Sequence, residues 1–205
     1  MRRSFPRGTQ GATAWVFALT LLLFSLNPSA AHAAPLSADM IVSVPDQVLA
    51  LVDRGKLIAR YSISTSKFGT GDSAASYRTP LGTLFVSAKV GDRLPAGAVI
   101  KSRIPTGEVV TVDAPGRDAI VARVIWLRGM EAQNQKARDR CIYIHGTPEE
   151  RRIGNPASFG CIRMRSRDVI DLYDRVHIGT HVVITLQKIH DLIKPEEPDL
   201  LARSD

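Results

Sequence analysis

The sequence predicts a mostly β domain of the α+β kind over residues 39–187. Short apolar or alternating runs of strand length recur through this region. Glycine- and proline-bearing turns separate these runs. Only one clear stretch, late in the chain, repeats its apolar residues at helical spacing. Together these observations predict many short strands and a small helical part.

The first half of the domain reads as strands joined by turns. A Gly-bearing turn at residues 53–56 predicts a hairpin, and the Gly/Ser-rich segment 70–78 predicts an exposed loop. The turn Thr79-Pro80-Leu81-Gly82-Thr83 leads into the next strand. The strands expected here are Met40–Val44, Gln47–Val52, Leu57–Ser64 and Leu84–Ala88.

The second half adds further strands and the helix. Residues 131–140 are polar and predict a loop or short helix. Ser166 is a candidate cap for a helix with Asp168 in its first turn, where a negative charge is favourable. Gly179 would follow the end of that helix. Its apolar stripe is Val169, Ile170, Tyr173 and Val176. The strands expected here are Val99–Lys101, Glu108–Val112, Ile120–Trp126, Cys141–His145 and His181–Leu186.

The N-terminus has the pattern of an export signal. Arg2, Arg3 and Arg7 precede a stretch without charge, and its apolar core, Trp15–Leu26, is shorter than the roughly 20 residues that span a bilayer. Ala31-His32-Ala33 offers small residues for cleavage. We therefore expect a signal peptide at 1–33, a linker at 34–38, the domain at 39–187 and a tail at 188–205.

The predicted location is the periplasm or cell envelope. An uncleaved signal would instead hold the domain at the outer face of the inner membrane. Both the general and the twin-arginine export routes remain open.

The charge of the chain argues against nucleic acid as a partner. Loss of the three N-terminal arginines would take the formal charge from +7 to about +4. The remaining basic residues are scattered, and no aromatic residues alternate with them, so a nucleic-acid interface is not expected. A mildly basic surface does suit an anionic polymer such as a cell wall.

Two cysteines, Cys141 and Cys161, would meet an oxidising compartment. A disulfide between them is possible. However, Cys141 begins an alternating run typical of a strand and is expected to behave as a small apolar residue. We expect two free thiols, of which only Cys161 is reactive. Ligands at metal-binding spacing were not found, so neither a metal nor another cofactor is expected.

The chemistry of the chain is predicted at His145-Gly146-Thr147 and Ser158-Phe159-Gly160-Cys161-Ile162-Arg163. Only the thiolate of a cysteine is nucleophilic, and a neighbouring imidazole can remove its proton or, when charged, lower its pKa. Gly160 would let substrate approach the backbone, and nearby N–H groups could bind an oxyanion. The alternative is a buried apolar cysteine and a histidine that merely ends a strand.

These segments closely resemble the catalytic segment of L,D-transpeptidases of the YkuD type, which are bacterial cell-wall enzymes. His-Gly-Thr, a short loop, Ser-x-Gly-Cys and the arginine match in type and order, and Thr79-Pro80-x-Gly82 resembles a second landmark. The resemblance implies a β-sandwich or barrel-like domain around an open catalytic cleft. It further implies that Cys161 is the nucleophile, His145 the base, and the Gly146 carbonyl the group that orients the imidazole.

The same resemblance implies a substrate and a reaction. The substrate would be a peptidoglycan tetrapeptide stem, cleaved with release of D-alanine and transferred through a thioester. The acceptor could be a second stem, a lipoprotein lysine, a free D-amino acid or water. A carbapenem should acylate the same thiol. The residues expected to line the substrate are Ser158, Phe159, Gly160 and Arg163.

One residue departs from the family pattern. Phe159 stands where the family usually has histidine, and phenylalanine can neither donate, accept nor ionise. If that histidine is auxiliary, activity survives. The alternatives are a thiol hydrolase of the same linkages and a peptidoglycan-binding module with weakened catalysis.

Overall fold

The computed structural model describes residues 38–193 of the chain. The predicted signal peptide, most of the predicted linker and the end of the predicted tail lie outside the described residues. Within residues 38–193 there is no helix of the length and apolar character needed to cross a membrane.

The described part of the chain is dominated by strands, as the sequence predicts. Its strands are β1 (Ala38–Ser43), β2 (Val48–Asp53), β3 (Lys56–Ser64), β4 (Gly82–Val90), β5 (Ala98–Lys101), β6 (Ile104–Val109), β7 (Val121–Gly129), β8 (Tyr143–Gly146), β9 (Ile162–Met164) and β10 (His181–Thr185). Its helices are α1 (Ser166–Arg175) and α2 (Ile189–Leu192), with the 3₁₀ turns η1 (Ala132–Asn134) and η2 (Glu150–Arg152).

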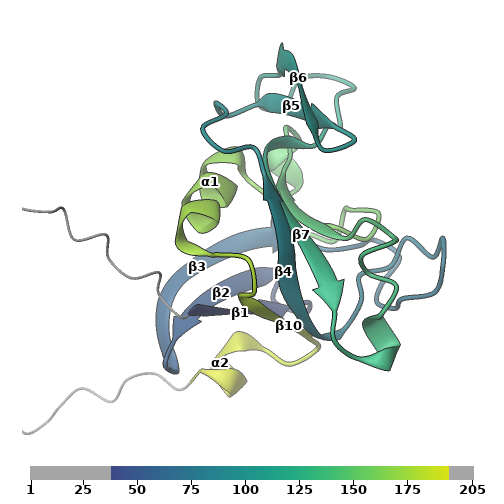
Figure 1. Ribbon diagram of the computed structural model, residues 1–205, viewed down its shortest axis with the longest axis vertical. Helices are drawn as coiled ribbons and strands as arrows, with labels where there is room; N and C mark the ends of the chain where they lie inside the picture. The colour runs from purple at the N-terminus through teal and green to yellow at the C-terminus, as the bar shows by residue number, and fades with distance from the viewer. Residues whose placement is uncertain (1–37, 194–205) are drawn as a thin grey trace, which may run out of the picture. The chain divides into compact units, whose positions relative to one another are not determined.

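The strands form one sheet that closes on itself. Their order is β4-β10-β1-β2-β3-β9-β8-β7-β5-β6, and an additional pairing of β4 with β7 completes a barrel-like ring. The β5–β6 hairpin continues from β7 and projects away from the ring (Figure 1). Pairing is antiparallel except for β1 with β10 and β8 with β9. The predicted mostly β, barrel-like class is confirmed.

The main core lies inside this ring and is closed by α1. Inward-facing residues of the strands, such as Leu49, Leu84 and Ile144, are fully buried. The helix adds Val169 and Leu172 to the same apolar cluster. The core therefore fixes the position of α1 against β7 and β8, the strands that lead to the predicted site (Figure 1).

Two strands differ from the sequence prediction. β6 runs from Ile104 to Val109, whereas Glu108–Val112 was expected. Each of its side chains is exposed, so no buried face sets a register that the sequence could reveal. β9 was not predicted as a strand, because three residues are too few to show a period of two, although all three are buried.

Cys141 is not a strand residue, contrary to the prediction. Its φ of +55° places it in the left-handed region, and β8 begins only at Tyr143. Its backbone N–H donates to the carbonyl of Arg138 and closes a turn. The alternation of residues 141–145 therefore indicates the strand correctly but starts it two residues too early.

The helix boundaries also differ in detail. Ser166 is the first residue of α1 and not its cap; its backbone N–H donates to the carboxylate of Glu150 at 2.9 Å. A distant acidic side chain thus fills the role that the sequence assigned to a local hydroxyl. In the predicted tail, α2 packs the buried Ile189 against Val48 and Ala50.

Candidate active site

The parallel pairing of β8 with β9 brings the two predicted motifs together. His145 is in register with Arg163, and Cys161 lies two residues before Arg163. From strand spacing and rise, the Cα atoms of His145 and Cys161 are roughly 8 Å apart. Because side chains alternate along a strand, Tyr143 and His145 share one face of β8. Ile144, on the opposite face of β8, packs in the main core. His145 and Tyr143 therefore lie on the face that points away from that core.

His145 is buried, with 5% of its surface exposed. Its Nδ1 lies 2.8 Å from the carbonyl oxygen of Gly146, the contact that the resemblance implied. Since a carbonyl only accepts, Nδ1 carries the hydrogen and Nε2 keeps a free lone pair. Burial, assisted by the charge of Arg163, lowers the pKa of His145 to about 4, against the opposing effects of the Gly146 hydrogen bond and Asp118. The imidazole is a neutral base.

The residue after this histidine must be small. A Cβ on Gly146 would lie 2.6 Å from the backbone oxygen of Val121, on the neighbouring strand β7. Backbone cannot move aside as a flexible side chain can. Glycine therefore allows β7 and β8 to approach, and this places the carbonyl that orients His145.

Cys161 carries a half-buried thiol held by the backbone of the preceding segment. Its Sγ donates to the carbonyl of Cys141 at 3.3 Å and accepts from the N–H of Tyr143 at 3.5 Å. Burial raises the pKa of the Cys161 thiol to about 11, despite the Tyr143 N–H and the charges of Arg163 and Arg140. Across residues 38–193 no hydrogen bond joins this thiol to His145.

The thiol pKa corrects one sequence-based expectation. A charged imidazole was expected to lower the pKa of Cys161 and supply thiolate at neutral pH. In the structure the imidazole is neutral and the thiol is in a poorly solvated place, so both groups rest uncharged. This arrangement can transfer a proton when substrate arrives but does not store an ion pair. Both cysteines are free, as expected.

The turn that presents Cys161 is fixed from inside the protein. Ser158 is fully buried; its hydroxyl donates to the Cys161 carbonyl at 2.5 Å and accepts from the Gly160 N–H at 3.2 Å. Thr79 Oγ1 donates to the Gly160 carbonyl at 3.0 Å. Gly160 has a φ of +119°, which L side chains rarely adopt. The contact of Ser158 and Gly160 with substrate stays a prediction, while their part in shaping the turn is visible.

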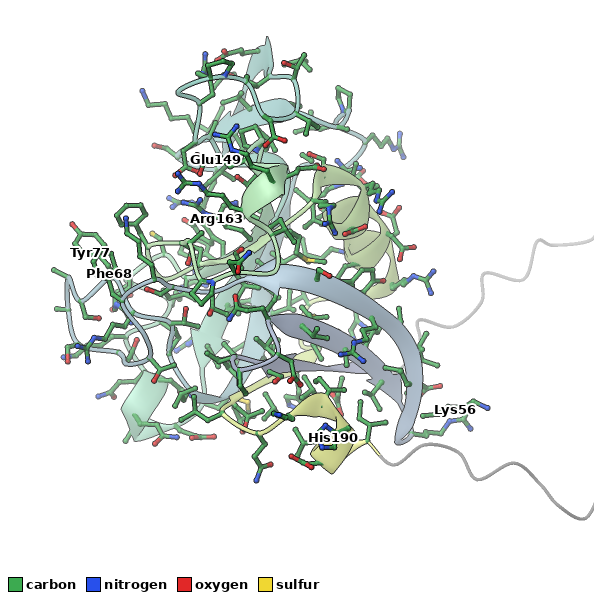
Figure 2. All side chains as sticks on the ribbon, turned by 180° about the vertical axis from the view of Figure 1, so that it is seen from behind. Lys56, Phe68, Tyr77, Glu149, Arg163 and His190 are labelled. Carbon is green, nitrogen blue, oxygen red and sulfur yellow. The ribbon has the colours of Figure 1, made fainter. Side chains whose placement is uncertain are left out.

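Arg163 is bound on both sides by carboxylates of the protein. Its side chain is 6% exposed; Nη2 lies 2.7 Å from Asp118 and Nη1 3.1 Å from Glu149. Figure 2 shows Arg163 and Glu149 close together. The predicted pairing with a substrate carboxylate would have to compete with these partners, and it stays a prediction.

Phe159 lies at the surface. It is 49% exposed and its ring contacts Phe68 and Tyr77. No titratable group thus stands at the position where the family usually has histidine.

Sequence reasoning missed several groups that shape the site. Asp118 and Glu149 lie in polar loops where nothing distinguishes them from solvated charges. Thr79 had a signal, because it opens the Thr-Pro-x-Gly landmark, but its bond to Gly160 crosses 81 residues of sequence. Only the fold shows these contacts.

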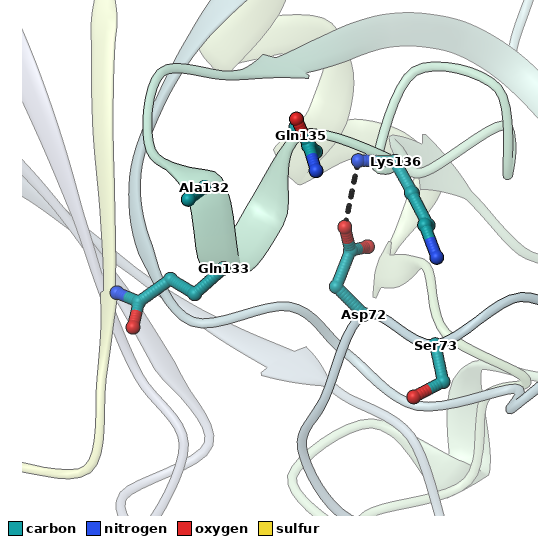
Figure 3. Close-up of a pocket in the computed structure, with 6 residues that line it drawn as sticks. All are labelled: Asp72, Ser73, Ala132, Gln133, Gln135 and Lys136. Atoms are coloured by element: carbon teal, nitrogen blue, oxygen red, sulfur yellow. Dashed lines mark hydrogen bonds between the residues drawn. The ribbon is translucent and has the colours of Figure 1, made fainter.

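An open polar pocket lies elsewhere on the domain. Its volume is about 250 Å³, and neither Cys161 nor His145 lines it. In Figure 3 the Lys136 N–H donates to the Asp72 carboxylate across this pocket. The lining residues are Asp72, Ser73, Ala132, Gln133, Gln135 and Lys136. Among residues 38–193, no cluster of three or more His, Cys, Asp or Glu is arranged to hold a metal ion.

Comparison with known proteins identifies similar chains. The family model for the L,D-transpeptidase catalytic domain, YkuD, matches residues 37–184. YqjB of Bacillus subtilis, which carries the name of an L,D-transpeptidase, is 45% identical over 51 residues, covering 24% of this chain and 29% of YqjB. YkuD of Bacillus licheniformis, named likewise, is 52% identical over 42 residues, covering 20% of this chain and 26% of that protein. The aligned segments thus span less than a third of either relative.

A solved L,D-transpeptidase from Mycobacterium smegmatis is 18% identical, with a TM-score of 0.48, covering 73% of this chain and 58% of that structure.

Proposed function

Because this chain belongs to the L,D-transpeptidase catalytic domain family, we propose that it transfers peptidoglycan stem peptides through a thioester on Cys161. The observation that carries the proposal is the parallel pairing of β8 with β9. This pairing places His145, whose Nε2 is free, on β8. The neighbouring strand, β9, begins directly after Cys161. The substrate is a tetrapeptide stem, and the bond cleaved joins its third residue to D-alanine.

In the first half-reaction Cys161 attacks the carbonyl carbon of the third residue. The thiol proton passes to Nε2 of His145 as the carbon–sulfur bond forms. The tetrahedral oxyanion meets the backbone N–H of Cys161, which donates to no protein acceptor within residues 38–193. The carbon–nitrogen bond then breaks, and His145 returns the proton to the amine of the departing D-alanine. A thioester remains.

In the second half-reaction an amine attacks the thioester carbon. His145 takes the proton of the amine and gives it to the departing sulfur, which restores the thiol. The acceptor is an amine of a second stem, a lipoprotein lysine or a free D-amino acid, and water would give hydrolysis. We place the reaction in the periplasm, where peptidoglycan is accessible and where it would serve wall synthesis and cell shape.

The neutral resting pair has a consequence for this reaction. The thiol must leave the Cys141 carbonyl before it can transfer its proton to His145, so substrate binding has to rearrange the hydrogen bonds of Sγ. Arg163 lowers the pKa of both the thiol and the imidazole, and so favours thiolate over thiol during attack. The guanidinium can thus act on the charge of the sulfur even where its carboxylate partners keep it from substrate.

The decisive experiment is the intact mass of the purified domain after incubation with a tetrapeptide stem or a carbapenem. We expect a covalent adduct that peptide mapping assigns to Cys161, since a strained lactam carbonyl presents the same electrophile. Cys161→Ala should form no adduct. Turnover that persists in this variant would refute the mechanism.

Two further variants test the assigned roles. His145→Ala should slow acylation roughly 100- to 10,000-fold, the range of general-base catalysis. Phe159→His restores the residue usual in the family; an unchanged acylation rate would show that this histidine is auxiliary. A large gain would show that Phe159 weakens the enzyme.

A second candidate function is a peptidoglycan-binding module without turnover. The observation that favours it is the raised pKa of Cys161 together with the hydrogen bond of its thiol to Cys141 and not to His145. A reduced Cys161 that forms no adduct with stem or carbapenem, in a protein that still sediments with peptidoglycan, would support this alternative.

A further inference from the structure

Three exposed aromatic rings gather beside the nucleophile. Phe68 is 45%, Tyr77 56% and Phe159 49% exposed. Among residues 39–193 no other aromatic side chain is exposed to this degree. Figure 2 shows Phe68 and Tyr77 side by side at the edge of the domain. Exposed apolar groups gathered in one place typically mark a binding surface, whereas single ones do not.

The rings form one continuous surface, which we call the aromatic patch (Phe68, Tyr77 and Phe159). Their centroids are 5.7 to 6.1 Å apart. The rings are tilted toward one another at 42° to 84°, so they do not cover each other's faces by stacking. The Lys67 ammonium lies over two rings of the patch, 4.3 Å from the centroid of Phe159 and 5.3 Å from that of Phe68.

The backbone beneath the patch is held in place. The Phe68 N–H donates to Ser66 Oγ at 3.0 Å, and the same hydroxyl donates to the Tyr77 carbonyl. The Lys67 N–H donates to the Ser158 carbonyl at 3.2 Å, which ties this loop to the turn of Cys161. A prearranged surface loses little entropy on binding.

Tyr77 is held in an unfavourable conformation. Its φ of +56° lies in the left-handed region, which is a true outlier for a bulky residue. Such conformations cost of order 1–3 kcal/mol and persist at sites where they position a side chain for use. Here the conformation belongs to a ring of the patch.

We propose that the aromatic patch with Lys67 binds an N-acetylated sugar ring of the glycan strand that carries the stem. This inference rests on the proposed function, because it places the patch on the same polymer as the thioester site. Phe159 is joined to Cys161 through Gly160 alone, so a ligand on the patch lies close to a stem at the thiol.

The chemistry of the polymer favours the sugar over the stem. The methyl group of D-alanine is too small to cover three rings. A pyranose ring offers a face of C–H bonds of matching size to an aromatic ring. Its hydroxyl and acetamido oxygens accept hydrogen bonds, and the Lys67 ammonium has three donors.

The test measures binding of a soluble tetramer of β-1,4-linked N-acetylglucosamine, which carries no stem, by ligand-observed NMR. Phe68→Ala and Phe159→Ala should each raise Kd about tenfold, as expected for loss of an aromatic contact. Ile178→Ala, at a more exposed apolar side chain outside the patch, should leave Kd unchanged. Phe68→Leu keeps apolar area without a ring and should also weaken binding.

Several outcomes would overturn the inference. They are absence of tetramer binding, equal binding by all variants, full binding by Phe68→Leu, and binding to lipid vesicles in place of the tetramer. Acylation of Cys161 by a free tetrapeptide is measured in parallel. Acylation without tetramer binding refutes the glycan site and leaves the proposed function intact. Tetramer binding without acylation refutes the transferase and retains the site.

Discussion

Arg163 Nη2 donates to Asp118 Oδ2 at 2.7 Å although 45 residues of sequence separate the two. The loop before β7 is thereby joined to β9, which begins immediately after Cys161. Glu149 holds the other side of the same guanidinium. The charge of Arg163 lowers the pKa of both His145 and Cys161, and the charge of Asp118 raises the pKa of His145.

We expect Arg163→Met to destabilise the domain by about 1–3 kcal/mol, because it leaves the mostly buried Glu149 with only the longer, half-exposed contact to Arg152 at 3.7 Å. Asp118 is 40% exposed, so Asp118→Asn should cost no more than about 1 kcal/mol. Urea unfolding at neutral pH compares the two variants. Equal losses would contradict the assigned difference in burial.

The reactivity of Cys161 toward alkylating reagents should keep rising well above neutral pH. Because burial raises its pKa to about 11, the rate of alkylation by iodoacetamide should increase throughout the range from pH 7 to 10, without a plateau. Cys141→Ser is the matched control, and it should react like the unchanged protein because only its backbone carbonyl binds the Cys161 thiol. A plateau near neutral pH in this variant would reveal a stored thiolate.

His145 should make the domain sensitive to acid. Its folded pKa of about 4 lies below the ordinary value of 6.5, so between these pH values the unfolded chain binds a proton that the folded one does not. The contribution of the neutral His145 to the free energy of unfolding is therefore fully present above about pH 6.5. It declines by about 3 kcal/mol as the pH falls to 4. Urea unfolding at pH 7 and pH 4 should show a smaller decline for His145→Gln. An equal decline in both proteins would assign the acid sensitivity to other groups.

Thr79 should control the turn that presents Cys161. Its hydroxyl donates to the Gly160 carbonyl and accepts from the Ser66 N–H. Thr79→Val keeps the shape but leaves these buried groups unpaired, which costs about 1–3 kcal/mol for each group. We expect slower acylation of Cys161, followed by intact mass, together with lower stability. Thr79→Ser retains the hydroxyl and should preserve both; loss in Thr79→Ser but not in Thr79→Val would point to the methyl group instead.

The addition of one carbon atom at Gly146 should disturb the position of His145. In Gly146→Ala the new Cβ would meet the Val121 backbone oxygen at 2.6 Å, so β8 must shift. We expect a changed NMR signal for the His145 imidazole and slower acylation. Gly154→Ala is a control at another glycine, where an added Cβ meets nothing within 4 Å, although its φ, unlike that of Gly146, is positive. An unchanged imidazole signal in Gly146→Ala would show that the strands adapt.

The sequence alone determined the class of fold and the chemical groups of the site. Strand-length apolar runs separated by turns predict the sheet, because alternation of side chains follows directly from strand geometry. The spacing of His145 and Cys161 predicts neighbouring segments, and the glycines beside them predict tight backbone. Each of these features depends on residues close together in the chain. The sequence also placed Phe159 beside the substrate, but nothing local indicated that its ring joins those of Phe68 and Tyr77.

Only the tertiary structure decided how these groups are placed and charged. The sequence suggested a thiolate, but the pKa of Cys161 depends on burial and on Arg163, whose partners come from two separate loops. Likewise, the ring of Phe159 contacts Phe68 and Tyr77 only because the loop after β3 folds against the turn that presents Cys161. The solvation of a group and the charges around it depend on which residues lie near it in space. A sequence pattern reveals such neighbours only within a single helix or strand.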